Sequence, residues 1–309
     1  MTEALRPAAP ARSAASTRRL GQVLIAAASV AWSLAGVMQR GLSDGVTTAT
    51  QIGGRAGVAF IALSFLARRE TSRSGTPLLR SIDRGGLAVA LCMGAGSASF
   101  VFALNRTSVA NVLFLQALAP FIAVVLGWAF LKEIPSRRTG VATVIAVAGV
   151  GLMVGGPSRG SLIGLGAAGL MTFLFALTIV ITRHRRDISM APAVALAMLL
   201  VFVCAAPFAS WGDITATDWL LLVLMGTAQM GIGQACFVHG ARLIPAAEVA
   251  LLTLLEVVLG PLWVALAFAE YPGSLTLVGG AVVLAAVVYQ ATEATAADEP
   301  PPLVSEHSA

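Results

Sequence analysis

Charged side chains are scarce in this chain. Only 11% of its 309 residues are Asp, Glu, Lys or Arg, whereas 57% are hydrophobic. An ordinary soluble domain carries about 25% charged residues. The composition therefore excludes a typical soluble protein and indicates that lipid is the main solvent of the chain. Length alone would suit about two soluble domains, but the hydropathy overrides that interpretation.

Cysteine is also rare, and its placement excludes a disulfide framework. The three cysteines are Cys92, Cys204 and Cys236, an odd number, and all of them lie within apolar stretches. We expect them to act as small packing residues in an apolar environment.

Signatures of catalysis and of cofactor binding are missing as well. The sequence has no GxSxG, no HExxH, no paired Cys/His metal spacing, no Walker loop and no GxGxxG placed after a strand. Ser97 and Ser99 lack an evident general base, which a nucleophile inside the membrane would need. The sequence predicts no enzyme, no metal and no cofactor, and the lack of a nucleotide-binding domain disfavours ATP-driven transport. An intramembrane enzyme and a non-transporting membrane scaffold remain as alternatives.

What the sequence does contain is ten long apolar runs. Each has the ~20 residues that a helix needs to cross ~30 Å of hydrocarbon. Eight are free of charge: 20–39, 85–105, 107–131, 139–158, 160–182, 188–212, 219–241 and 271–292. Two more, 46–67 and 246–269, carry charges inside them. Because the first run is full length and nine more follow, we interpret it as a retained helix and not as a cleaved signal peptide.

Basic residues predict the orientation of these helices. With a cytoplasmic N-terminus, sixteen Lys and Arg residues fall on the inner side and three, Arg40, Arg106 and Arg159, on the outer side. This bias predicts a multi-pass protein of the cell (plasma or inner) membrane with both termini in the cytoplasm. The pI near 9.8 does not indicate a nucleic-acid partner, because the basic residues are spread among many loops. The expected partners are the lipid bilayer and a small-molecule substrate.

The two tails have compositions that cannot bury a core. Residues 1–19 are rich in Ala, Arg, Ser and Pro, and residues 293–309 are acidic with a Pro triplet. We expect both to be disordered cytoplasmic segments.

The chain matches itself weakly when it is shifted by 137 residues. The shift superimposes Gly96, Ala98, Phe100, Ala110 and Glu133 on Gly233, Ala235, Phe237, Ala247 and Glu270. The alternative is that two stretches rich in Ala, Leu and Gly align by composition alone. A true repeat gives two five-helix units, 20–158 and 159–292, and an odd number of helices makes the second unit enter the membrane from the opposite side. The predicted fold is an all-α membrane protein of ten transmembrane helices built from two five-helix inverted repeats.

At this point the sequence resembles the EamA-type branch of the drug/metabolite transporter superfamily. The resemblance is carried by residues 103–140 and their counterpart 240–280, with a mid-helix Pro120, an apolar run that ends in Glu133, and a glycine-rich helix after it. The second half departs from the pattern, since its proline comes later, at Pro261.

The resemblance implies secondary active, alternating-access transport of a metabolite or drug-like solute, with export as the expected direction. Helices 1 to 4 and 6 to 9 would surround the pathway. Helices 5 and 10 would lie at the periphery, where they are the expected surface for a homodimer.

Two charged residues at membrane depth are the principal site candidates. Arg55 lies near the middle of helix 2 and Glu256 near the middle of helix 9. Each costs ~2.5 to 3.5 kcal/mol at a helix centre, so the two must be paired or hydrated. One hypothesis places them in a central aqueous cavity, in contact with the substrate, with each other or with a coupling proton. The alternative is a buried pair that only locks helices together. One cation and one carboxylate favour an amino-acid-like substrate.

Several polar and aromatic residues within the runs are weaker candidates for substrate binding or coupling, and packing is the alternative for each. They are Gln234, Trp32, Asn111, Gln116, Thr253 and His239. Gln234 is preferred over Gln229 as the cavity residue of helix 8. Pro120 and Pro261 are expected to kink helices 4 and 9 and to free backbone carbonyls there.

Overall fold

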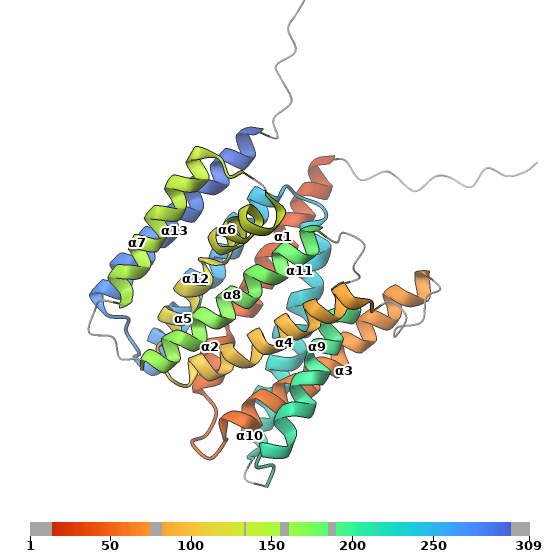
Figure 1. Ribbon diagram of the computed structural model, residues 1–309. Coiled ribbons are helices and arrows are strands. Elements are labelled where there is room, and N and C mark those ends of the chain that lie inside the picture. Colours follow the sequence, from red (N-terminus) through yellow and green to blue (C-terminus); the bar gives the residue numbers. More distant parts are fainter. Residues whose placement is uncertain are drawn as a thin grey trace, which may run out of the picture.

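The computed structural model describes residues 14–74, 82–132, 134–154, 161–184, 190–212 and 214–297, and in these ranges all regular secondary structure is helical. Figure 1 shows the helices gathered into one bundle, with α7 and α13 side by side along one edge.

The first half contains seven helical elements. They are α1 (Ala14–Ser33), α2 (Ala35–Arg40), α3 (Thr48–Ser74), α4 (Arg84–Leu104), α5 (Val109–Gln116), α6 (Ala119–Leu131) and α7 (Arg137–Val154). Side-chain caps fix two of the starts, since Asp83 accepts a hydrogen bond from the Gly86 amide and Ser108 accepts one from the Asn111 amide. α1 and α2 follow one another across Leu34 and read as one interrupted span, as do α5 and α6.

All regular secondary structure in the described part of the second half is helical as well. They are α8 (Leu162–His184), α9 (Met190–Ala205), the 3-10 turn η2 (Ala206–Phe208), α10 (Ala216–Leu224), the π-helix η3 (Met225–Ile232), α11 (Gly233–Ala241), α12 (Ala246–Phe268) and α13 (Ser274–Ala297). A capping box formed by Thr215 and Asp218 starts α10. α10, η3 and α11 form one continuous span with a wider turn in its middle.

Eight spans in the described residues are long and apolar enough to cross a membrane. α3, which contains Arg55, and α7, which begins with Arg137 and Arg138, are not among them. The predicted count of ten therefore stays a prediction. Large apolar side chains such as Ile61, Phe130 and Leu266 are more than two-thirds exposed on the surface of the bundle. An apolar exterior of this kind marks a surface that lipid covers.

Packing partners are exchanged between the two halves. The third span of each half packs on the first two spans of the other half. In the first half this span is α4, which packs on α8 and α9; in the second half it is the span of α10, η3 and α11, which packs on α1 and α3. α1 also packs on α12, and correspondingly α5 and α6 pack on α8. The pairs α3 with α9 and α7 with α13 join elements that hold the same place in each half. Such an exchange is typical of two units related by a twofold axis.

The ends of α6 and α12 share an unusual backbone feature. Lys132 and Ala269 are the only non-glycine residues with positive φ in the described part of the chain, at 56° and 52°. Each ends its helix in the left-handed conformation, which non-glycine residues seldom adopt. The two positions are 137 residues apart, the same shift that aligns the sequence with itself. Glu133, which follows Lys132, lies outside the described residues.

The boundaries of the tails differ from the sequence expectation. α1 begins at Ala14, so residues 14–19 are helical, and α13 continues to Ala297, beyond the expected end at 292. The Arg18 side chain forms an ion pair with Glu248 at the start of α12, which fastens the first turns of α1 to the bundle. Residues 1–13 and 298–309 lie outside the described residues.

Candidate functional site

Arg55 is buried in the bundle with part of its hydrogen-bonding capacity unused. Its side chain leaves α3 and is 3% exposed. Nη2 donates to the Ser97 hydroxyl on α4, and the guanidinium carbon lies 5.7 Å from the centre of the Phe100 ring. Nη1 is buried and has no hydrogen-bond partner among the described residues. An unsatisfied donor on a buried cation is rare, because it forfeits the hydration that it had in water.

Glu256 is buried on α12 with one weak contact. The residue is 6% exposed, and its Oε1 accepts a hydrogen bond of 3.4 Å from Gln116 Nε2 at the end of α5. In the part of the chain that the structure describes, neither Arg55 nor Glu256 takes part in an ion pair. The two groups therefore have separate neutral partners, and the structure does not bring them into contact with each other.

Polar side chains near Arg55 form two separate hydrogen-bonded groups, one of Arg55 with Ser97 and one of Gln39, Thr48, Gln51 and Asn105. We call the two groups together the polar seam. Thr48, Gln51 and Arg55 follow each other at helical spacing on one face of α3, whereas Ser97 belongs to α4 and Asn105 directly follows it. Gln39 reaches the seam from α2 and donates to both Gln51 and Asn105.

Sequence reasoning selected Arg55 from this set and missed Gln39, Gln51 and Asn105. Gln39 and Asn105 end two apolar runs, so they looked like residues of the membrane surface. The signal that could have found the seam is the polar spacing on α3, where positions 48, 51 and 55 share one face.

Aromatic residues tie helices together near the centre of the bundle. Trp32 Nε1 donates to the Gln229 carbonyl at 3.0 Å, and its ring lies 5.2 Å from that of Phe237. Gln229 belongs to the π-helix η3 and is 4% exposed, and no residue in the described ranges forms a hydrogen bond with its Oε1. Single π-turns occur often at functional sites. Gln229 is thus a stronger candidate than the predicted Gln234, which lies half-buried on α11.

Three other predicted residues have local structural partners. Asn111 is buried, donates to Thr107 Oγ1 at 3.0 Å and accepts from Thr276 Oγ1 at 3.2 Å. Thr253 donates to the Ala250 carbonyl of its own helix at 2.8 Å. His239 is exposed, with Nδ1 2.8 Å from the Ala235 carbonyl oxygen. These contacts account for the three side chains without a ligand.

The two prolines lie in different helical contexts. The fourth span is divided between Gln116 and Ala119, directly before Pro120, which occupies the first turn of α6. α12 runs without interruption through Pro261. Pro120 thus coincides with a break in its span, whereas Pro261, inside a continuous helix, leaves the carbonyl four residues before it without its N–H donor.

Two ion pairs connect the first span to α12 and to the residues directly after it. Arg18 pairs with Glu248 at one end of the bundle, and Gln22 Nε2 donates to the same carboxylate at 2.8 Å. Arg40 pairs with Glu270 at the other end, with 2.7 Å between Nε and Oε2. Arg40 also donates to the carbonyls of Leu104 and Thr107. Both pairs are suited to a structural role, because their charged groups already form hydrogen bonds within the protein.

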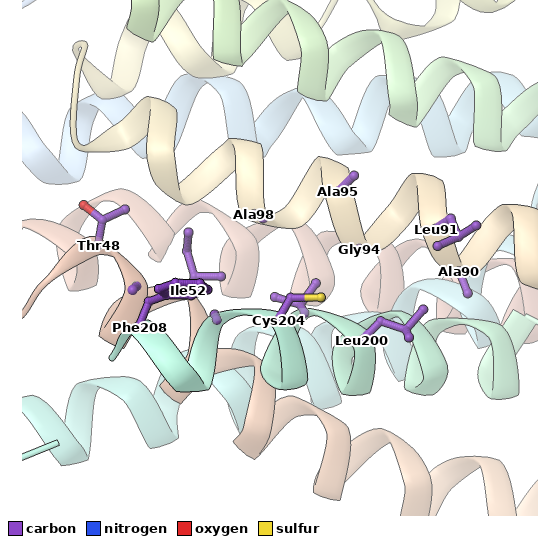
Figure 2. A pocket seen from close by; sticks show the side chains of 13 residues that line it. Thr48, Ile52, Ala90, Leu91, Gly94, Ala95, Ala98, Leu200, Cys204 and Phe208 are labelled. Atoms are coloured by element: carbon purple, nitrogen blue, oxygen red, sulfur yellow. The ribbon is translucent and has the colours of Figure 1, made fainter. Parts of the chain in front are cut away.

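Two cavities lie beside these elements. A polar cavity of about 650 Å³ adjoins the Arg40–Glu270 pair and includes Asn111 and Thr276. An apolar cavity of about 530 Å³ lies between α3, α4 and α9. Figure 2 shows Gly94 and Ala98 of α4 facing Leu200 and Cys204 of α9 across it. Neither cavity includes Arg55 or Glu256. Within the described ranges no three His, Cys, Asp or Glu side chains gather as a metal site would require.

Comparison with known proteins relates the chain to one family. The model of the EamA-like transporter family matches residues 19–155 and again residues 162–291. Twenty-four chains of solved structures match as well. One, described only as "Crystal structure of protein", has 15% sequence identity and a TM-score of 0.65 over 90% of this chain and 99% of its own. At that identity the likeness concerns the fold alone. No curated protein matches the chain.

Proposed function

The chain belongs to the EamA-like transporter family, and we propose that it is a secondary active transporter that moves a small organic metabolite or drug-like solute by alternating access. The observation that carries the proposal is the burial of Arg55 and Glu256 in the bundle, with no ionic partner for either in the part of the chain that the structure describes. The family match indicates the class of activity, and these two residues indicate where in the bundle the solute or a coupling proton would bind.

The energetic case starts from the cost of charge at membrane depth. Arg55 and Glu256 cost ~2.5 to 3.5 kcal/mol each, or ~5 to 7 kcal/mol together, when nothing compensates them. One hydroxyl and one amide are the only hydrogen-bond partners that the two side chains have among the described residues. A membrane scaffold gains nothing from that cost. A transporter does, because a polar solute or a coupling proton that visits the site supplies the missing interaction.

We further propose ten spans in two oppositely oriented five-helix units. The exchanged packing partners and the left-handed residues Lys132 and Ala269 support this arrangement. The positive-inside bias supports a cytoplasmic location for both termini in the cell membrane. In that orientation the Arg18–Glu248 pair faces the cytoplasm and the Arg40–Glu270 pair the outside. α7 and α13, which pack chiefly on each other, are the peripheral helices and the proposed homodimer surface.

Export of an amino-acid-like solute is the favoured activity. One buried cation and one buried carboxylate suit a solute with both charges better than a solute with one. A screen of the purified protein for thermal stabilisation by amino acids, polyamines and sugar phosphates will identify the class. Absence of stabilisation by every class, together with absence of flux in proteoliposomes, would refute transport.

The decisive experiment is solute flux in proteoliposomes that contain Glu256→Gln. We expect a loss of flux or of its pH dependence, because the amide cannot take up and release a proton. Glu248→Gln is the matched control: it makes the same change on the same helix, at a carboxylate that has a cationic partner. Equal rates and equal pH profiles for Glu256→Gln and the unchanged protein would reject the role of Glu256.

A further inference from the structure

One face of α4 connects a cation to the apolar cavity. Arg106 lies two residues after the end of α4, and its guanidinium carbon lies 4.8 Å from the centre of the Phe102 ring. Three residues that line the apolar cavity precede Phe102 on the same face of the helix, at helical spacing. They are Leu91, Ala95 and Ala98. The ring contact therefore places the guanidinium at the end of the face along which the cavity runs.

No carboxylate in the described residues compensates the charge of Arg106. Both ion pairs there join other residues. Arg106 also borders the polar cavity, but Glu270 in that cavity is already paired with Arg40. An exposed guanidinium without an ionic partner is suited to a phosphate group, which accepts charge-assisted hydrogen bonds from it.

Arg106 lies at the level of the lipid headgroups. It belongs to the segment 105–108, which joins two consecutive membrane spans, Arg84–Leu104 and Val109–Leu131. Because the spans fill the hydrocarbon layer, the segments that join them lie beside the headgroups. The phosphate of a lipid in the adjacent leaflet can therefore reach this guanidinium at the membrane surface.

The apolar cavity suits a hydrocarbon chain. Its volume is about 530 Å³, and Thr48 is the only residue with a side-chain oxygen among the described residues that line it. Water would lack polar partners there, and apolar cavities of this kind bind apolar molecules. Leu91 and Phe208, which line the cavity, are 55% and 77% exposed, so it borders the surface that lipid covers. Figure 2 shows Cys204 of α9 across the cavity from Ala98 of α4.

We propose that Arg106 and the apolar cavity form one phospholipid site. The phosphate binds the Arg106 guanidinium, and an acyl chain lies in the cavity along α4. Ala98 lies eight positions before Arg106, about 12 Å along a helix, which leaves room for the glycerol esters beside Phe102. In the proposed orientation the lipid belongs to the outer leaflet. The cavity includes neither Arg55 nor Glu256, so this site is separate from the proposed place of the solute and does not depend on transport.

Cys204 can report whether the cavity is occupied. In the purified full-length chain with Cys92→Ala and Cys236→Ala, Cys204 is the remaining thiol, and it is exposed. The rate of its alkylation is measured in a neutral detergent with phosphatidylglycerol, with diacylglycerol of the same chains, or with glycerol 1-phosphate. At equal concentrations we expect only phosphatidylglycerol to slow the reaction, because it alone has both the phosphate and the acyl chains.

Arg106→Gln removes the cation that would bind the phosphate. It should raise the phosphatidylglycerol concentration for half-protection of Cys204 about 10-fold, since hydrogen bonds to charged groups are the strong ones. Arg242→Gln is the matched control, because Arg242 is also exposed and directly follows the end of a helix, α11. We expect this control to leave the protection unchanged.

A second variant tests the chain-binding half of the site by another measurement. Ala98→Leu fills part of the cavity, so it should reduce the rise in melting temperature that phosphatidylglycerol gives. Ala148→Leu, at an exposed position of α7, is its control and should keep the full rise. This arm decides the matter if Arg106→Gln fails to fold.

Four results would overturn the assignment. Equal protection by phosphatidylglycerol and diacylglycerol would remove the phosphate from the site. Protection by glycerol 1-phosphate as strong as that by the lipid would indicate a free phosphate ester. Equal half-protection in Arg106→Gln and Arg242→Gln would remove Arg106, and an equal rise in melting temperature for Ala98→Leu and Ala148→Leu would remove the cavity.

Discussion

Of the two carboxylates in ion pairs, Glu248 and Glu270, we expect the loss of Glu270 to destabilise the bundle more. It follows the end of α12 and pairs with Arg40 of the first span, with 2.7 Å from Oε2 to Nε and 3.4 Å from Oε1 to Nη2. Oε1 also accepts from the Val109 amide at 3.1 Å, at the start of α5. The perturbation that we consider is Glu270→Gln, which keeps the shape of the side chain and removes its charge.

The size of the effect follows from burial. The Arg40 and Glu270 side chains are 26% and 22% exposed, whereas those of Arg18 and Glu248 are 61% and 13% exposed. Hydrogen bonds to charged groups contribute about 1.5 to 3 kcal/mol when partly buried, and exposed ion pairs contribute about 0 to 1 kcal/mol. We therefore expect Glu270→Gln to lower the free energy of unfolding by about 2 to 3 kcal/mol and Glu248→Gln by less than about 1 kcal/mol.

Thermal unfolding in one detergent at one protein concentration measures both changes. The Glu270→Gln protein should melt several degrees below the Glu248→Gln protein. A double-mutant cycle with Arg40→Gln should show a coupling between Arg40 and Glu270, because each single substitution removes the same contact. Equal melting temperatures for the two glutamate variants, or independent effects of Arg40 and Glu270, would refute the inference that the Arg40–Glu270 pair stabilises the protein more than the Arg18–Glu248 pair does.

Two further predictions concern the helix packing and the topology. A Cβ atom on Gly279 would lie 2.3 Å from the Gly149 carbonyl oxygen, so Gly279→Ala should force α7 from α13 and lower the melting temperature, whereas Gly151→Ala, with open space around it, should not; equal melting would contradict the close backbone contact. Single cysteines at Asp44 and Asp187, in a chain without Cys92, Cys204 and Cys236, should be labelled from opposite sides of the membrane by an impermeant thiol reagent, and labelling from the same side would contradict the inverted repeat.

Much of the helical layout was accessible from composition and spacing. Apolar runs mark spans because each must match the thickness of the hydrocarbon layer, and every predicted run corresponds to helix in the described residues. The interruptions were less accessible. The break before Pro120 has a local cause, because proline has no N–H to donate to the carbonyl four residues earlier and its ring clashes with the preceding turn. The break at Leu34 and the π-turn of η3 have no local signal, because packing between helices sets them.

The residues of the candidate site likewise fall into those that the sequence could identify and those that it could not. Arg55 and Glu256 could be selected from the sequence, because a charge inside an apolar run is costly wherever its side chain points. Their partners could not be selected. Ser97 and Gln116 are ordinary polar residues in the sequence, and only the packing of α4 on α3 and of α5 on α12 places them beside the two charges.

By itself, the sequence determined that this is a membrane protein, that it resembles one transporter superfamily, and that Arg55 and Glu256 lie within long apolar runs. Those properties depend on hydropathy, motif and position along a helix, all of which are local. Only the tertiary structure decided that Arg55 and Glu256 have separate partners, and that Gln39, Gln51 and Asn105 form hydrogen bonds with one another. Hydrogen-bond partners on different helices are set by how the helices pack, and packing depends on contacts between residues far apart in the chain.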